Sequence, residues 1–331
     1  MEAWILGQKG SAAEATPPRQ AAGPLFSIVI PAWNREDTIA RCLDSILAQR
    51  FTDYEILVVD DGSTDATADR VRAYRDPRVR LLRHDTNRGS YTARATAIGQ
   101  SRGAWVLVVG SDDALCPGAL EKMAAMAGEV SPGVGVIGLS YRYTDGSSCP
   151  DPAFPAGETG FEGWLAWLNA ARRVDFLTAF RRPVLEEVPM PSDGRGSLQM
   201  MMRIASRWRL RVDADEGGLV YDDAPNRLSL SSAILLRPEA MERQAVMNDE
   251  VLEEFGPVLR RVAPQQHGGI LFAAGRWYFL AGRRWKGARR MLAFIRRHPL
   301  SARGWAYLVL GLVGPGALVW AHKHMQGAGG G

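Results

Sequence analysis

The sequence predicts an α/β fold in which a mostly parallel central sheet is flanked by helices and followed by a helical extension. Short apolar runs rich in β-branched residues end abruptly in polar residues at 26–30, 55–59 and 105–109. Such runs are typical of buried strands. Segments of helical spacing separate them, and helical crossovers connect parallel strands.

Length and composition indicate how the chain is divided. A chain of 331 residues, 46% hydrophobic and 23% charged, has room for one domain of about 200 residues and a smaller unit. We expect a disordered leader at 1–24, an α/β domain at 25–228, a helical connector at 229–265 and a basic helical region at 266–331. The leader has an early acidic residue and only a short apolar run, so it lacks the features of a secretory signal.

The charge of the chain is unevenly distributed. Residues 255–331 contain 12 basic and no acidic residues, and subtracting these from the net charge of +4 leaves −8 for the rest. We therefore expect the tail to touch something anionic. Its tryptophans, Trp285 and Trp305 among them, suit the headgroups of an anionic membrane. The alternative is a solvated hairpin packed on the α/β domain, and no motif indicates nucleic-acid binding.

The first strand, at 26–30, leads into a helix. Asn34 is expected to cap this helix, because its side chain can accept hydrogen bonds from free backbone amides. Ile39, Leu43 and Ile46 recur at helical spacing and predict one buried face.

The second strand, at 55–59, runs into a turn rich in carboxylates. Gly62 permits a sharp turn, and Ser63 or Thr64 is expected to cap the next helix. A third helix is expected at 89–99.

The strand at 105–109 delivers Asp112 and Asp113, and 115–126 is expected to be helical again. Ligands bind at the carboxyl ends of parallel strands, where these polar residues fall. The sequence therefore predicts an acidic pocket at that edge of the sheet.

The segment GVGVIG at 133–138 matches the glycine spacing of a dinucleotide-binding loop. No strand precedes it and it continues as a strand into a turn, so we do not expect a nicotinamide site. Residues 198–208 and three short segments after 266 are expected to be helical.

Four segments, taken in order, closely resemble the opening of family-2 glycosyltransferases, which have the GT-A nucleotide-sugar-binding fold. They are SIVIPAWNREDTIARCLDSILAQ, YEILVVDDGSTD, NRGSYTARATAIGQ and AWVLVVGSDDALCPGAL. The resemblance implies an inverting transfer of a hexose from a nucleoside diphosphate, commonly UDP, to an acceptor hydroxyl, assisted by Mn²⁺ or Mg²⁺. A hard divalent cation held by one or two carboxylates stabilises a diphosphate leaving group.

The resemblance also implies which residues bind the donor. Asp61 would hydrogen-bond the base, commonly uracil, and Pro31, Ala32 and Asn34 would line the base and ribose. Arg94 would neutralise the diphosphate. From the residues alone, the alternatives are that Asp60 or Asp61 caps the following helix and that Arg94 is a solvated helix residue.

Asp113 would ligate the metal ion, and Asp112 would touch the ribose or the metal. Many relatives carry D-x-D-D where this chain has Gly110-Ser111-Asp112-Asp113, so one carboxylate is missing. The remaining pair can still bind a cation. The alternative for both residues is a simple helix cap.

The catalytic base is the second departure from the family pattern. An inverting transfer needs a carboxylate that accepts the proton of the acceptor hydroxyl. Gly196-Ser197 stands where many relatives have an E-D pair. Asp193 is the nearest substitute and our predicted base, with an ordinary turn residue as its alternative. Asp175 and Asp145 are further candidates.

Together these features predict a glycosyltransferase of cell-surface polysaccharide or lipid-linked glycan biosynthesis. We expect a cytoplasmic protein, peripheral on the inner face of the membrane. Its three cysteines lack the spacing of a zinc site or a disulfide framework, which fits a reduced compartment. The alternative is a homologue that binds a nucleotide sugar without turnover and acts as a scaffold.

Overall fold

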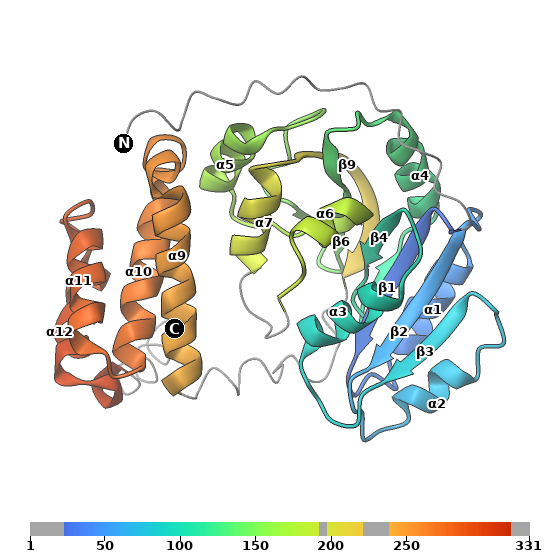
Figure 1. The fold of residues 1–331 in the computed structure, drawn as a ribbon, viewed down its shortest axis with the longest axis horizontal. Coiled ribbons are helices and arrows are strands. Elements are labelled where there is room, and N and C mark those ends of the chain that lie inside the picture. The colour runs from blue at the N-terminus through green and yellow to red at the C-terminus, as the bar shows by residue number, and fades with distance from the viewer. Residues whose placement is uncertain (1–22, 192–196, 221–237, 319–331) are drawn as a thin grey trace.

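A computed structural model describes residues 23–191, 197–220 and 238–318. A sheet lies between helices, and further helices extend from one end of the molecule (Figure 1). The strands are β1 (Phe26–Ala32), β2 (Tyr54–Asp60), β3 (Val79–Arg83), β4 (Trp105–Val108), β5 (Ala114–Leu115), β6 (Val134–Tyr143), β7 (Ser148–Cys149), β8 (Leu177–Arg181) and β9 (Arg209–Val220). The helices are α1 (Ile39–Leu47), α2 (Thr67–Arg72), α3 (Ser90–Gln100), α4 (Ala119–Glu129), α5 (Phe161–Ala170), α6 (Arg182–Glu187), α7 (Ser197–Ala205), α9 (Pro238–Val262), α10 (Pro264–Leu280), α11 (Arg284–Ile295) and α12 (Ala302–Val313).

The sheet has the order β3-β2-β1-β4-β8-β6-β9-β5, with β7 paired to β6. β1 runs parallel to β2 and β4, and β2 runs parallel to β3. β8 is antiparallel to both β4 and β6, whereas β6 and β9 are parallel. The predicted mixed, mostly parallel sheet is confirmed. The carboxyl ends of β1, β2 and β4 therefore meet at one edge, where ligands bind in such sheets.

Apolar side chains cover both faces of the sheet. Ile28 and Ile30 point to the face covered by α1, α2 and α4, and Val29 points to the face covered by α3, α5, α6 and α7. This alternation follows from the period of two along a strand. Both faces are buried, which explains why the strands are continuous apolar runs in the sequence.

β1, β2 and β4 begin and end within two residues of their predicted positions, but the helix caps were predicted wrongly. α1 begins at Ile39 after Thr38, whereas Asn34 lies in a loop with a φ angle of 50°. α2 begins after Ala66, and Ser63 accepts a hydrogen bond from the backbone of Asn34 instead of capping it. These residues hold two loops together at the ends of β1 and β2.

The fourth predicted helix also begins later than expected. Ala114 and Leu115 form β5, which pairs with β9, and α4 begins only at Ala119. The predicted division at 228/229 falls within 221–237, outside the described residues, and the one at 24/25 lies two residues after the undescribed range 1–22. The domain boundaries stay predictions.

The glycines of GVGVIG have a packing role within strand β6. A methyl group at Gly135 would lie 2.7 Å from Cβ of Trp208, and one at Gly138 would lie 2.5 Å from the ring of Phe176. These glycines let bulky side chains lie directly on the sheet. The expectation that this segment is a strand, with no dinucleotide loop, is confirmed.

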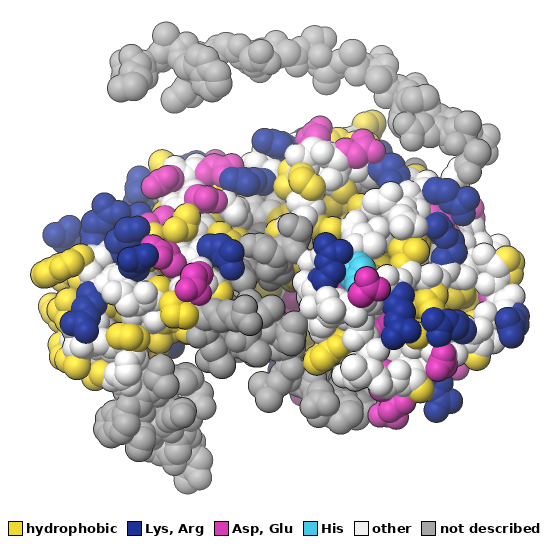
Figure 2. All heavy atoms as spheres, turned by 60° about the horizontal axis from the view of Figure 1, so that its bottom comes forward, with side chains coloured by type: hydrophobic (Ala, Val, Ile, Leu, Met, Phe, Trp, Pro, Cys, Tyr) yellow, Lys and Arg dark blue, Asp and Glu magenta, His cyan; other side chains and the backbone are white. Residues whose placement is uncertain are grey.

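The helices after residue 237 dock on the sheet domain through α9. Phe255 of α9 is buried and its ring lies 5.5 Å from that of Phe161 on α5. Asn169 accepts a hydrogen bond from the backbone of Gln265 at 2.8 Å. The three predicted helices after residue 266 are confirmed as α10, α11 and α12, and many Lys and Arg side chains lie on them (Figure 2).

Candidate active site

The loop after β4 presents two carboxylates and is held from behind by helix α1. The backbone N–H of Asp113 donates to the carbonyl of Gly110 at 3.1 Å and closes a tight turn. Three side chains of the α1 region donate to carbonyls of this loop. They are Thr38 to Ser111 at 3.1 Å, Arg41 to Asp112 at 2.9 Å and Cys42 to Gly110 at 3.4 Å. The backbone of the turn is therefore fixed while its acidic side chains stay at the surface of a cavity.

Gly110 replaces a carboxylate residue of the family pattern for a steric reason. A methyl group at Gly110 would lie 2.5 Å from Oδ2 of Asp113 and 3.1 Å from Oδ1 of Asp112. The space that a side chain at 110 would need is already occupied by these two carboxylates. The glycine and the position of Asp113 therefore depend on each other.

Arg35 connects this acidic loop to the loop after β1. Its Nη2 lies 3.6 Å from Oδ2 of Asp112, and its Nη1 donates to the carbonyls of Asn34 at 3.0 Å and Trp33 at 3.3 Å. The contact of Arg35 with Asp112 was not predicted from the sequence. No local spacing links residue 35 to residue 112, although its position beside the predicted base-binding residue Asn34 was a signal.

Asp61 is buried beneath the loop that leads into α3. Its carboxylate contacts Nδ1 of His84 at 2.6 Å and accepts hydrogen bonds from the backbone N–H groups of Arg88 and Gly89, the latter at 2.7 Å. The side chain is only 3% exposed. Asp61 thus fixes the start of the helix that carries Arg94, and its predicted contact with a base stays a prediction.

Pro31 and Ala32 end strand β1, and Ala32 is buried. Oδ1 of Asn34 accepts a hydrogen bond from the backbone of Thr64 at 3.0 Å. These three predicted donor residues lie at and just after the carboxyl end of β1, where Asp61 donates its backbone N–H to the carbonyl of Ala32, and they do not line the cavity described next.

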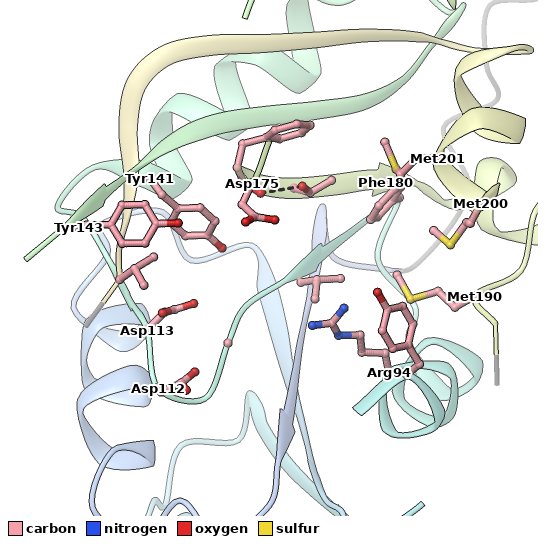
Figure 3. Close-up of a pocket in the computed structure, with 16 residues that line it drawn as sticks. Arg94, Asp112, Asp113, Tyr141, Tyr143, Asp175, Phe180, Met190, Met200 and Met201 are labelled. Atoms are coloured by element: carbon pink, nitrogen blue, oxygen red, sulfur yellow. Dashed lines mark hydrogen bonds between the residues drawn. The ribbon is translucent and has the colours of Figure 1, made fainter. Parts of the chain in front are cut away.

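A cavity of about 430 Å³ opens at this edge of the sheet and brings together Arg94, Asp112 and Asp113 (Figure 3). Tyr141, Tyr143 and Asp175 line its polar part. The remaining wall is largely apolar and consists of Val108, Phe176, Phe180, Met190, Met200, Met201 and Val220, with Tyr91, Gly110 and Thr178. Of the predicted site residues within the described part of the chain, the cavity unites Arg94 with the carboxylate pair.

Arg94 lines the cavity with one buried donor atom unpaired within the described residues. Its guanidinium carbon lies 5.0 Å from the centre of the Tyr91 ring. Its Nε is buried and has no hydrogen-bond partner among the described residues. A buried donor without a partner is costly, so this geometry suits an anionic ligand.

Burial and the nearby acidic pair raise the pKa of two neighbouring side chains. Burial, and then the charge of Asp113, raises the pKa of Tyr141 well above its ordinary value. Burial, and then Asp113 and Asp112, likewise raises the pKa of Cys42. Both groups stay neutral at physiological pH. Tyr141 is therefore a neutral hydroxyl that can donate a hydrogen bond into the cavity.

Two of the three candidate bases, Asp175 and Asp145, lie within the described residues. Asp193 lies outside the described residues. Asp175 lines the cavity from the segment before β8. Asp145 lies in a turn, where it accepts a hydrogen bond from the backbone of Ser147 at 2.8 Å, and it does not line the cavity.

Asp112 and Asp113 are the candidate ligands of a divalent cation. Within the described ranges, no cluster of three or more His, Cys, Asp and Glu side chains is arranged to hold a metal ion. Mg²⁺ is typically held by one or two carboxylates together with substrate phosphates. The adjacent carboxylates of Asp112 and Asp113 fit that requirement, because hard oxygen donors suit both Mg²⁺ and Mn²⁺.

An acidic pair at the end of the sheet, with an arginine across the cavity, suits a divalent cation together with an anionic ligand. Residues 27–188 match the family model of glycosyl transferase family 2. Over this region, just under half of the chain, the sequence matches that family, and the fold is GT-A.

Curated relatives match about a third to two fifths of the chain. The chain is 42% identical over 132 residues to succinoglycan biosynthesis protein ExoO of Rhizobium meliloti, covering 40% of this chain and 38% of the relative. It is 40% identical over 115 residues to a PGL/p-HBAD biosynthesis glycosyltransferase of Mycobacterium bovis, covering 34% and 44%. The match thus spans less than half of either relative.

Solved structures share the fold over most of the chain. S. aureus TarS 1-349 in complex with UDP-GlcNAc superposes with a TM-score of 0.60 at 22% identity, over 87% of this chain and 89% of that one. The mannosyltransferase PcManGT from Pyrobaculum calidifontis, in complex with GDP-Man and Mn²⁺, superposes with a TM-score of 0.52 at 18% identity, over 90% and 87%. In the described part of this chain, no helix combines the length and hydrophobicity needed to cross a bilayer.

Proposed function

We propose that the protein transfers a hexose, with inversion, from a UDP-sugar to an acceptor hydroxyl during synthesis of a cell-surface polysaccharide or a lipid-linked glycan. The observation behind this proposal is that Arg94 shares one cavity with Asp112 and Asp113. A cation-binding pair and a free guanidinium in one site suit a diphosphate, because the ligand can be neutralised from two sides.

UDP and a polysaccharide product are supported by the relatives' names. One relative, 35% identical over 102 residues, is a UDP-Glc:alpha-D-GlcNAc-diphosphoundecaprenol beta-1,3-glucosyltransferase of Escherichia coli. Another serves succinoglycan biosynthesis. We accordingly propose a glycan or lipid-linked acceptor, and a cytoplasmic enzyme that works peripherally at the inner face of the membrane.

Each residue has a proposed role. Asp113 and Asp112 would hold Mn²⁺ or Mg²⁺, which when bound stabilises negative charge on the leaving diphosphate. Arg94 would bind the diphosphate oxygens, and Tyr141 would donate a hydrogen bond as a neutral hydroxyl. Pro31, Ala32, Asn34 and Asp61 would form the base and ribose side.

Two carboxylates are candidates for the catalytic base. Asp193 stays our proposed acceptor of the hydroxyl proton. Asp175 is the described carboxylate that lines the cavity without belonging to the acidic pair. Comparison of Asp193→Asn with Asp175→Asn separates them, because loss of the base lowers kcat about 100-fold or more and leaves donor binding intact.

Thermal unfolding with a panel of nucleotide sugars, with and without Mn²⁺, tests the site directly. A UDP-sugar at about 100 times its Kd adds about 2.7 kcal/mol to the free energy of unfolding. We expect this stabilisation to require Mn²⁺ and to be lost in Asp113→Asn. Asp145→Asn is the matched control and should respond like the unaltered protein. A full Mn²⁺-dependent response of Asp113→Asn would contradict the metal assignment.

The absence of the E-D pair at 196–197 favours a second candidate, a homologue that binds the donor without transfer. Such a protein would show the same thermal stabilisation. It would form no glycosylated product from a radiolabelled donor, whereas the proposed enzyme would.

A further inference from the structure

Exposed apolar side chains are concentrated on the outermost helices. Among the described residues, seven of the nine exposed large hydrophobic side chains belong to residues 285–313. Leu300 is 97% exposed and Trp285 is 85% exposed. The others are Leu292, Trp305, Val309, Leu312 and Val313. A concentration of this kind on a folded surface indicates an interaction site.

These side chains form a continuous face. Trp305, Val309 and Leu312 follow the spacing of one side of α12, and Trp285 and Leu292 lie on one side of α11. The two helices run antiparallel, because Arg284 at the start of α11 lies beside Gly314, just after α12. Helix α12 has 12 residues, so the exposed face is about 18 Å long at about 1.5 Å per residue. Helix α11 beside it makes the face wider.

Cations surround this face without carboxylate partners. Arg283, Lys286 and Arg290 form ion pairs with Glu242 or Asp249 of α9. No such ion pair forms within the described residues at a second set of arginines, which are Arg284, Arg289, Arg296, Arg297 and Arg303. Figure 2 shows Lys and Arg side chains next to hydrophobic ones at this end of the molecule.

We propose that this face of α11 and α12 docks on an anionic membrane surface. Tryptophan and aliphatic side chains would enter the boundary between headgroups and acyl chains, and the arginines around them would contact anionic headgroups. A second copy of the chain is the weaker alternative, because a symmetric interface would bring the same unpaired arginines together. The apolar stripe also distinguishes this surface from one built for phosphate backbones alone.

Vesicle sedimentation of the full chain, in the absence of nucleotide sugar, tests the proposal. The protein should bind vesicles of phosphatidylcholine with phosphatidylglycerol, and bind vesicles of phosphatidylcholine alone far less. Arg296→Gln/Arg297→Gln should lower the partition coefficient about 25-fold, since each basic residue near such a surface contributes about fivefold. Arg70→Gln/Arg75→Gln on and near α2 is the matched control and should leave it unchanged.

The apolar part is tested separately. Trp305→Ser/Val309→Ser should lower the partition coefficient about tenfold or more, because it removes apolar area without changing the charge. Val246→Ser, at an exposed valine of α9, is the matched control. Circular dichroism of each variant establishes that it is folded. Unchanged vesicle binding by folded Trp305→Ser/Val309→Ser would overturn the proposal.

Other occupants would also overturn it. One such result is a concentration-dependent dimer that Val309→Ser abolishes, and another is binding to duplex DNA as tight as binding to anionic vesicles. The experiment involves no turnover, so its outcome is independent of the proposed reaction. Loss of vesicle binding with intact donor-induced stabilisation contradicts this surface, and with it the proposed peripheral location, but leaves the proposed reaction standing. The reverse result contradicts the proposed reaction only.

Discussion

Single residues in this site are constrained by their neighbours more than by the family pattern. The carboxylate of Asp113 occupies the space beside Gly110. Asp112 forms an ion pair with Arg35, whose Nη2 lies 3.6 Å from Oδ2 of Asp112. The space beside Gly110, where the family pattern has a carboxylate, is therefore occupied by the carboxylates of Asp112 and Asp113. The acidic loop has to be judged as one unit, and a count of its aspartates is a poor measure of its cation affinity.

Restoring the family carboxylate should therefore harm the site. We expect Gly110→Asp to displace Asp113 and to weaken Mn²⁺ binding about tenfold or more, the usual effect of misplacing a ligand. Titration calorimetry of Mn²⁺ in the presence of UDP measures it. Gly99→Asp adds the same charge where no atom lies within 4 Å and serves as control. Tighter Mn²⁺ binding by Gly110→Asp would show that all three carboxylates coexist.

Glu55 gives a pH-dependent prediction. Burial raises its pKa, but hydrogen bonds from Ser27 and Arg102 outweigh burial and leave the pKa below its ordinary value. Ser27 donates to Oε1 at 2.8 Å and Arg102 contacts Oε2 at 3.0 Å. Because the folded-state pKa is depressed, the stabilisation is present above the unfolded-state pKa of about 4.3 and is lost as pH falls through the folded-state value.

We therefore expect Glu55→Gln to lower the free energy of unfolding at pH 7 by about 2 kcal/mol, the scale of hydrogen bonds to a buried charged group. The difference from the unaltered protein should shrink in acid. Urea unfolding at several pH values measures it, with the exposed Glu253→Gln as control. A constant difference at every pH would mean that the carboxylate charge is not the stabilising feature.

At the scale of elements, the sequence predicted strands better than helix ends. β1, β2 and β4 are buried on both faces, so their apolar runs mark them directly. Caps depend on loop partners far along the chain, as Asn34 with Ser63 at 2.9 Å demonstrates. β5 is two residues long and exists only because it pairs with β9, so no local pattern reveals it.

The site divides in the same way. Asp112 and Asp113 were predicted because strand ends meet at one edge of a parallel sheet, whereas Arg94 was predicted from the family resemblance. Arg35, His84 and Tyr141 were missed, because their places depend on contacts between distant segments. Asp61 was identified at the correct strand end, and its burial under the following loop is a property of the fold that the motif does not encode.

Helices α10 and α12 pack closely where Gly311 of α12 faces the ring of Phe279 on α10. Phe279 of α10 is fully buried, and a methyl group at Gly311 of α12 would overlap its ring. We expect Gly311→Ala to lower the free energy of unfolding by about 1–3 kcal/mol, as overpacking does. Gly269→Ala in α10 has open space and should stabilise by up to about 1 kcal/mol. Chemical denaturation of both variants compares them, and a stable Gly311→Ala would indicate that α12 can shift away.

For the molecule as a whole, helix α9 shares a core with the sheet domain, while α11 and α12 pack in a cluster of their own with Phe279 of α10. Val251, Phe255 and Leu259 of α9 belong to the same apolar cluster as Val29 of β1. Phe255 is 6% exposed and packs on Phe161. The two regions are therefore expected to unfold together, although the chain divides into an α/β domain and a helical region.

Phe255→Ala should lower the melting temperature of the entire protein. Truncation of a buried phenylalanine costs about 3–5 kcal/mol, which corresponds to a fall of roughly 6–15 °C for a protein of this size. Calorimetry should show a single transition that moves as one, because the cavity opens in a core common to both regions. Leu300→Ala, at a fully exposed position, is the control and should leave that transition in place. If Phe255→Ala instead produced two transitions, of which only the lower moved, the helices would be an independent unit and α9 a linker between them.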